Sequence, residues 1–236
     1  MKALVIIPAY NEADIIKKVV DNLMLNYPQF DYVVINDCST DKTLEVLKVN
    51  NYNYINLPIN LGIGGAVQTG YIYALQEGYD IAIQIDGYGQ HDPVYLDPAV
   101  QLIKDGVADI IIGSRFIKRE GFQSDSLRRF GIHFLSFLIR LVCGAKVKDV
   151  TSGYRIVNAQ FIEIYSRNYA QDYPEPEAIV LAQFQGAKIM EIPVIMNSRE
   201  SGKSSISAIK SIYYMAKVSL SILIYRLSLK KGGRTL

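Results

Sequence analysis

Short apolar runs alternate with amphipathic segments along the first half of the chain. The intervening segments carry apolar residues three and four positions apart and predict helices that end near residues 25, 49, 76 and 104. The apolar runs predict β-strands at residues 3–7, 32–35, 54–57, 81–85 and 109–113. Strands that alternate with helices at this spacing are typical of an α/β fold with a mostly parallel, doubly wound sheet.

The pattern changes after the fifth strand. We expect a strand that crosses back after Arg155, a late strand over residues 188–196, and helices that end near residues 143, 167, 185 and 229. The first of these helices is long and apolar, and the last is followed by a basic tail. Residues 1–206 are therefore read as one domain, and residues 207–236 as a C-terminal amphipathic helix with its tail.

Composition narrows the class of protein. The chain has 236 residues, half of them apolar and a fifth charged, which suffices for a full hydrophobic core. The net charge of +2 does not suggest a nucleic-acid partner. Cys38 and Cys143 are far apart and form no disulfide or metal pattern, so a reducing compartment is expected. The first residues read as a strand and not as a signal peptide.

Two segments approach the length and apolar character of a membrane span without reaching them. Residues 130–143 are interrupted by His133 and Arg140, and residues 212–227 by Lys217 and Arg226. A span needs about 20 uninterrupted apolar residues. Both segments are therefore expected to lie on a membrane surface; the alternative is an ordinary core or a dimer interface.

Three predicted strands end in polar turns that contain a carboxylate, at Glu12, Asp37 and Asp86. Parallel strands end at the same edge of a sheet, where open α/β sheets bind ligands. These carboxylates therefore predict a binding site. The local alternative is turn and cap chemistry, with Ser39 or Thr40 capping the second helix and Asp92 capping a helix that begins at Pro93.

A dinucleotide site is the obvious competitor. The glycine-rich candidate at residues 62–65 follows the third strand instead of the first, and Val67 stands where a third glycine belongs. The sequence therefore argues against that reading.

The order of the motifs resembles family 2 glycosyltransferases with a GT-A fold. The subgroup it resembles makes polyprenyl-phosphate sugars, and the later motifs resemble bacterial cell-wall and polysaccharide members. The similarity covers about residues 1–206. The motifs that carry it are PAYNE (8–12), NDCSTD (36–41), a DxD-like turn at Asp86 followed by QHDP (90–93), GSR (113–115), DVTSGYR (149–155), DYPEPE (172–177) and ESGKSSI (200–206).

The resemblance implies a donor site for a nucleotide sugar. Asp37 would bind the base, and Asp86 would face the ribose and a diphosphate bound to Mg²⁺ or Mn²⁺. The other implied donor-binding residues are Pro8, Tyr10, Asn11, Glu12, Gln90, Arg199 and Lys203.

The chain departs from the family pattern at position 88. The second acid of the DxD motif is replaced by Tyr88, and a neutral phenol is no anionic ligand. Asp92 could contribute instead, or Arg199 and Lys203 could neutralise the diphosphate. An adapted site and a catalytically impaired one both remain open.

The resemblance also implies an acceptor site. Arg115, Arg128 and Arg129 match positions that hold the acceptor lipid's phosphate, and a guanidinium matches phosphate oxygens well. The alternative is that Arg128 and Arg129 only flank a surface helix. Asp149 matches an acid near the reacting centre. A phosphate is already ionised near neutral pH, so we expect Asp149 to orient groups; Asp86, Asp149 and Arg115 are the expected catalytic residues.

The resulting expectation is an inverting glycosyltransferase. It would move a hexose or N-acetylhexosamine from a nucleotide sugar, with uridine diphosphate favoured, to undecaprenyl phosphate for cell-wall or surface polysaccharide synthesis. We expect it at the cytoplasmic face of the membrane, with a small membrane partner protein and a homo-oligomer both open. One alternative extends a lipid-linked saccharide, with Asp149 or Glu177 as base. Another is a nucleotide-sugar-binding protein without catalysis, suggested by Tyr88.

Overall fold

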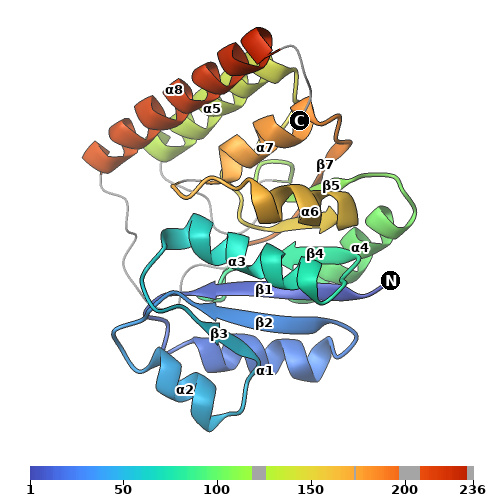
Figure 1. The fold of residues 1–236 in the computed structure, drawn as a ribbon, viewed down its shortest axis with the longest axis vertical. Helices are drawn as coiled ribbons and strands as arrows, with labels where there is room; N and C mark the ends of the chain where they lie inside the picture. Colours follow the sequence, from blue (N-terminus) through green and yellow to red (C-terminus); the bar gives the residue numbers. More distant parts are fainter. Residues whose placement is uncertain (119–125, 173, 197–207, 233–236) are drawn as a thin grey trace.

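The computed structural model describes residues 1–118, 126–172, 174–196 and 208–232 (Figure 1). Within them, seven strands form one sheet in the order β3-β2-β1-β4-β6-β5-β7. The strands are β1 (Ala3–Ala9), β2 (Asp31–Asn36), β3 (Tyr54–Asn56), β4 (Ile81–Gln84), β5 (Ile110–Ser114), β6 (Arg155–Asn158) and β7 (Ile189–Pro193). β6 runs antiparallel to its neighbours β4 and β5, and the other pairings are parallel. The predicted mostly parallel sheet is confirmed, and β6 is the strand that crosses back.

Helices cover both faces of the sheet. They are α1 (Ile16–Asn26), α2 (Thr43–Val49), α3 (Gly62–Gln76), the short 3₁₀ helix η1 (Pro93–Tyr95), α4 (Leu96–Lys104), α5 (Ser126–Cys143), α6 (Ala159–Arg167), α7 (Pro174–Phe184) and α8 (Ala208–Gly232). Alternate residues of β1 enter different cores, because side chains alternate across a strand. Leu4 and Ile6 pack with α3, α5, α6 and α7, whereas Val5 and Ile7 pack with α1, α2 and α4.

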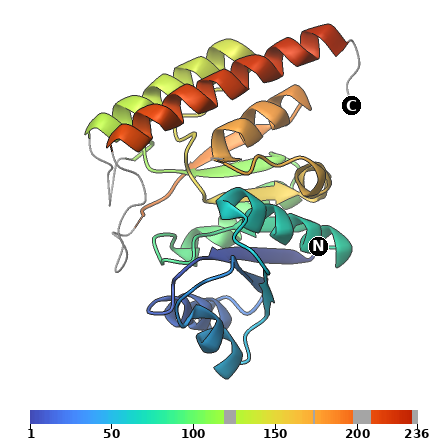
Figure 2. The same cartoon turned by 60° about the vertical axis from the view of Figure 1, so that its left-hand side comes forward.

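The C-terminal helix lies along α5 as a second layer above α7 (Figures 1 and 2). Val218 and Ile222 of α8 are buried in the same core as Ile132 and Ile139 of α5. Gly131 permits close approach, because a Cβ there would lie 2.9 Å from the sulfur of Met215. The division of the chain near residue 206 stays a prediction. None of the helices in the described ranges has the length and apolar character needed to cross a membrane.

α1 begins at Ile16, and the amides of Glu12 and Ala13 before it donate to the side chains of Thr43 and Asp41. The cap predicted for the second helix is wrong. α2 begins at Thr43, and neither Ser39 nor Thr40 caps it; the Oδ1 atom of Asp41 accepts from the Thr43 amide instead. The predicted cap at Asp92 is confirmed, with its Oδ1 atom 3.0 Å from the Val94 amide nitrogen and Pro93 next.

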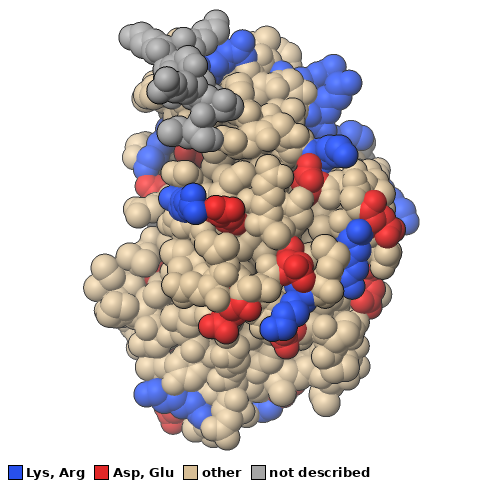
Figure 3. Space-filling model, turned by 45° about the vertical axis from the view of Figure 1, so that its right-hand side comes forward, with Lys and Arg blue, Asp and Glu red and all other residues tan. Residues whose placement is uncertain are grey.

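Charged residues of both signs are interspersed over the face shown in Figure 3, in line with the small net charge of +2. The basic residues at the top of that view lie over the α5–α8 layer.

Candidate active site

One edge of the sheet gathers most of the predicted site positions. β4 and β5 both run antiparallel to β6, so they point in the same direction as β1 and β2. The residues that follow these strands, Glu12, Asp37, Asp86 and Arg115, therefore lie along one edge, together with the loop that leads into β6. The predicted convergence of the carboxylate-bearing strand ends is observed.

Asp86 is buried at the centre of this edge, with 8% of its surface exposed. Its Oδ1 atom accepts a hydrogen bond from the Gln90 amide at 3.0 Å. Its Oδ2 atom is buried, lies 3.2 Å from His91 Nδ1, and accepts no hydrogen bond within the described residues. Buried polar atoms are normally paired. The unpaired oxygen therefore marks a position that a cation or a ligand hydroxyl would satisfy.

A glycine lets the Asp86 turn lie against β1. A Cβ at Gly87 would stand 2.8 Å from the carbonyl oxygen of Pro8, one of the predicted donor residues. Pro8 itself is buried in β1 and contributes backbone to this contact. The turn after β4 is thus held close to the turn after β1.

His91, which was not among the predicted site residues, holds the backbone of Asp86. The Asp86 amide donates to His91 Nδ1 at 3.0 Å, so this nitrogen carries no proton. Burial lowers the pKa of His91, and the nearby charge of Asp86 only partly opposes that effect. The imidazole packs edge-on against Tyr154, with ring centroids 5.2 Å apart. The sequence feature that could have identified His91 is the QHDP motif, in which it stands five residues after Asp86.

Asn11 joins the first two turns of the site. Its backbone has φ +57°, a conformation that Asn tolerates better than most residues. Its Oδ1 atom accepts from the Thr40 amide at 2.8 Å, and its own amide donates to Ser39 Oγ at 3.0 Å. Asn11 therefore positions the NDCSTD turn against the PAYNE turn. Tyr10 beside it is exposed, and Glu12 is half-buried.

Asp37, the residue after β2, is buried against the loop that leads into α3. Its Oδ1 atom accepts from the Leu61 amide at 2.7 Å, and burial raises the pKa of its carboxyl. The structure thus gives Asp37 a role in holding the loop before α3. Binding of a donor base by Asp37 stays a prediction.

The glycines at the start of α3 serve packing. A Cβ at Gly64 would stand 2.1 Å from the carbonyl oxygen of Ala170, and the Gly64 amide donates to the carbonyl oxygen of Gln171 at 3.1 Å. This close contact with another part of the chain agrees with the argument against a dinucleotide site.

Arg115 and Asp149 form a buried, two-pronged ion pair. Arg115 Nε lies 2.7 Å from Asp149 Oδ2, and Nη2 lies 2.6 Å from Oδ1. Asp149 has no exposed surface. Burial lowers the pKa of Arg115, but its hydrogen bonds and charge interaction with Asp149 raise the pKa by more, so the net shift is upward. Tyr88 adds a smaller upward effect. Asp149 therefore holds the Arg115 guanidinium in place, and Tyr88 acts on the same guanidinium. The catalytic roles expected of both residues stay predictions.

The other predicted acceptor arginines lie in the first turns of α5. Arg128 is exposed and Arg129 is half-buried. Arg128 acts electrostatically on Glu175 of the DYPEPE motif. Burial raises the pKa of Glu175, and the charges of Arg155 and Arg128 partly offset this shift. The start of α7 thus carries an acid that interacts electrostatically with the buried Arg155 and with Arg128.

The predicted metal site would have one clear ligand. Asp86 supplies an unpaired carboxylate oxygen, but Tyr88 supplies no second charge and Asp92 is engaged in capping η1. In the described part of the chain, no group of three or more His, Cys, Asp and Glu residues could hold a metal ion. These residues fit a cation held by Asp86 and a bound diphosphate, and they do not fit a cation held by protein alone. Arg199 and Lys203 lie outside the described residues.

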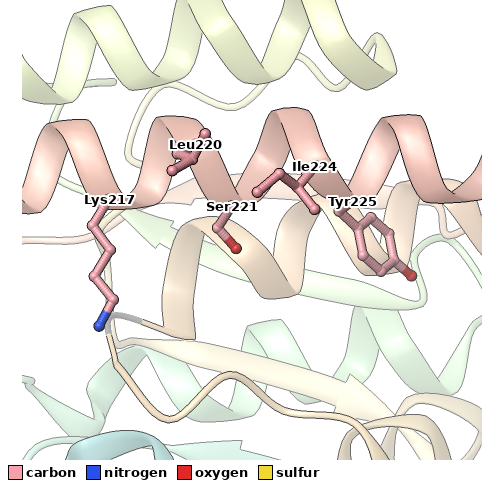
Figure 4. Close-up of a pocket in the computed structure, with 5 residues that line it drawn as sticks. All are labelled: Lys217, Leu220, Ser221, Ile224 and Tyr225. Atoms are coloured by element: carbon pink, nitrogen blue, oxygen red, sulfur yellow. The ribbon is translucent and has the colours of Figure 1, made fainter.

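Cavities also occur away from this edge. One of about 740 Å³ lies among α6, α7 and α8 and is lined in part by Glu177 and Tyr169. Another, of about 380 Å³, is lined by Lys217, Leu220, Ser221, Ile224 and Tyr225 of α8, with Lys217 reaching away from the helix (Figure 4). Lys217 pairs there with Asp172.

Comparisons with known proteins agree with this geometry. Residues 4–165 match the family described as glycosyl transferase family 2. An undecaprenyl-phosphate mannosyltransferase of Micrococcus luteus is 27% identical over 219 residues, covering 88% of each chain. A UDP-N-acetylglucosamine–dolichyl-phosphate N-acetylglucosaminyltransferase of Methanococcus voltae is 31% identical, covering 80% of this chain and 83% of the relative.

The fold is also found in solved structures. Glucosyl-3-phosphoglycerate synthase from Mycobacterium tuberculosis, in complex with Mn²⁺, uridine-diphosphate-glucose and phosphoglyceric acid, superimposes with a TM-score of 0.73. The match covers 95% of this chain and 79% of that one at 16% identity. At this identity the similarity concerns the GT-A fold alone. Together with the family match over residues 4–165, these findings show that the chain belongs to glycosyl transferase family 2.

Proposed function

We propose that this protein is an inverting glycosyltransferase that moves a hexose or N-acetylhexosamine from a nucleotide sugar to the phosphate of a polyprenyl lipid. One observation carries the proposal: the buried, unpaired oxygen of Asp86 shares a sheet edge with the Arg115–Asp149 pair. The named relatives that act on undecaprenyl phosphate and dolichyl phosphate support the acceptor class.

The two substrates would occupy neighbouring parts of the edge. The turns after β1 and β2 would hold the nucleotide through Tyr10, Glu12 and Asp37. Arg115, with Arg128 and Arg129 from α5, would hold the acceptor phosphate. β4 lies between these two groups in the sheet order, so the sugar would sit near Asp86.

Transfer would be a single displacement. An acceptor phosphate oxygen forms a bond to the anomeric carbon, the bond from that carbon to the nucleotide diphosphate breaks, and the diphosphate leaves with the electron pair. The acceptor phosphate is already ionised near neutral pH, so no base is needed. Asp149 keeps Arg115 oriented toward the acceptor. Mg²⁺ or Mn²⁺ at Asp86, when bound, would neutralise charge on the leaving diphosphate.

Tyr88 favours a second candidate, a nucleotide-sugar-binding protein without catalysis. Without a second anionic ligand, the protein would bind the cation more weakly, and the diphosphate would then leave more slowly. Extension of a lipid-linked saccharide has less support, because of the two bases expected for it Asp149 is committed to Arg115 and Glu177 lines the cavity among α6, α7 and α8.

We also propose that α5 and α8 rest on the cytoplasmic face of the membrane. Phe130, Phe134, Phe137 and Leu141 are exposed along one side of α5. Leu220, Leu223, Ile224 and Leu227 are exposed on α8. Neither helix contains an acidic residue, and both contain basic ones. This combination suits an anionic lipid surface. The small membrane partner and the homo-oligomer stay predictions.

The decisive experiment is a transfer assay with a panel of labelled nucleotide sugars and undecaprenyl phosphate, read as label in the lipid phase. We expect one donor to give product in the native protein and none in Asp86→Ala. Release of free sugar by the native protein without lipid product would point away from a lipid acceptor. Nucleotide binding with no turnover of any donor would favour the non-catalytic candidate.

A further inference from the structure

The loop that carries Asp149 is held through its backbone by side chains from neighbouring elements. Glu191 of β7 accepts two amide hydrogen bonds there, from Lys148 at 2.9 Å and from Asp149 at 2.8 Å, one on each carboxylate oxygen. Ser136 of α5 donates to the carbonyl oxygen of Val147. The approach of the chain to Asp149 is therefore set by contacts from α5 and β7.

Arg155 holds the other end of the same loop. Its Nε atom donates to the carbonyl oxygen of Ser152 at 2.9 Å, and Nη2 lies 3.4 Å from that of Val150. Arg155 is only 1% exposed. Its Nη1 atom has no hydrogen-bond partner among the described residues. The hydrogen bonds that the structure gives to this buried guanidinium therefore both go to the Asp149 loop.

Arg155 and Glu191 lie level with each other on the two strands that flank β5. Ile112 of β5 is paired with Arg155 on one side and with Glu191 on the other. Arg115 follows three residues after Ile112 along the chain. The loop thus crosses the end of β5 directly over Arg115. It is held by hydrogen bonds from Arg155 of β6 on one side and Glu191 of β7 on the other.

Two side chains of this loop meet Arg115. Asp149 pairs with its Nε and Nη2 atoms, and Thr151 Oγ1 lies 3.1 Å from Nη2. The direction of the guanidinium therefore depends on where the loop stands. A guanidinium recognises phosphate through a rigid fork, so a small rotation misplaces its hydrogen bonds.

We propose that Glu191 and Arg155 are positioning residues for the reaction, which act through the Asp149 loop to aim Arg115 at the acceptor phosphate. This inference rests on the proposed function only in naming the acceptor. Glu191 is the better residue to test. It is half-buried, so water can replace its bonds when it is changed, whereas a variant of the buried Arg155 would also challenge folding.

The test compares Glu191→Gln with Glu163→Gln, a matched change at an exposed acid of α6 that pairs with Arg167. We expect Glu191→Gln to raise the KM for undecaprenyl phosphate roughly tenfold, with the donor KM and the Tm close to native. Glu163→Gln should match the native protein throughout.

A second readout needs no substrate. The Nε–H resonance of Arg115 reports its hydrogen bond to Asp149, and we expect Glu191→Gln, but not Glu163→Gln, to shift it. An unshifted resonance would overturn the proposal, as would equal rises in both KM values with a lower Tm. If the native protein transfers no sugar while the resonance shifts as expected, the proposed function fails and the positioning role stands.

Discussion

Arg115 and Asp149 are 34 residues apart in the chain and form a two-pronged ion pair in the interior, with Nε–Oδ2 and Nη2–Oδ1 distances of 2.7 and 2.6 Å. Both side chains are almost fully buried. Such a pair is a weak source of stability, because desolvation offsets the attraction, but breaking it leaves a buried charge without a partner. Its value here lies in orienting Arg115.

Asp149→Asn is therefore expected to destabilise the protein by about 3–5 kcal/mol and to abolish most transfer. The double variant Arg115→Gln/Asp149→Asn, which removes both charges, should regain at least half of that stability and none of the transfer. Urea unfolding and the lipid-phase assay measure the two effects. A double variant no more stable than Asp149→Asn would contradict this account of the pair.

Tyr88 is the position at which the chain departs from the family pattern. A restored carboxylate would add a ligand and a negative charge for the cation beside Asp86. Tyr88→Asp should then increase metal-dependent transfer, by roughly tenfold if about 1.4 kcal/mol of transition-state stabilisation is regained. The assay is run with Mn²⁺ and with EDTA, and Tyr88→Asn supplies the uncharged control. Full native activity in EDTA together with a slower Tyr88→Asp would show that Tyr88 belongs to an adapted, metal-independent site.

Arg128 and Arg129 are expected to act on the acceptor. Loss of either charge-assisted contact to phosphate should raise the KM for the lipid phosphate roughly tenfold, with little change in the donor KM. Steady-state kinetics of Arg128→Gln and Arg129→Gln measure this, with Arg167→Gln on α6 as the control. A selective rise in the donor KM would assign the two arginines to the nucleotide instead.

Glu175 should make stability depend on pH. Because burial raises its pKa above the ordinary value of 4.5, against the charges of Arg155 and Arg128, the folded protein holds this proton more tightly than the unfolded chain. Its contribution is complete below pH 4.5 and is lost as the pH rises through the folded pKa. Glu175→Gln should therefore raise the Tm relative to the native protein at pH 7, and the gain should vanish at pH 4. A gain that grows on acidification would reverse the assigned direction of the shift.

The membrane proposal can be tested on the exposed side of α5. Phe137→Glu/Leu141→Glu should abolish flotation with vesicles that contain anionic lipid, since both side chains are exposed and would meet the lipid surface. Leu25→Glu/Val49→Glu changes two apolar residues of α1 and α2 that are even more exposed, and this variant should float like the native protein. Native protein that stays at the bottom of the gradient would exclude direct membrane binding.

The sequence by itself determined the α/β class, the parallel strands β1 to β5 and the edge at which their polar turns meet. Apolar periodicity is a property of consecutive residues, so it can be read without knowing what each face packs against. The cap at Asp92 was predictable for the same reason, because its partner Val94 is two residues away. The carboxylates after β1, β2 and β4 could be grouped because parallel strands share a direction.

Only the tertiary structure decided what these groups contact. The insertion of β6 between β4 and β5 brings the 149–152 loop over Arg115, and no local pattern specifies that position. The bond between Asp37 and the Leu61 amide, the backbone contact of Gly64 with Gln171 and the grip of Glu191 on the Asp149 loop each join distant segments. Such contacts depend on how the helices and strands pack, and local propensity carries no information about them.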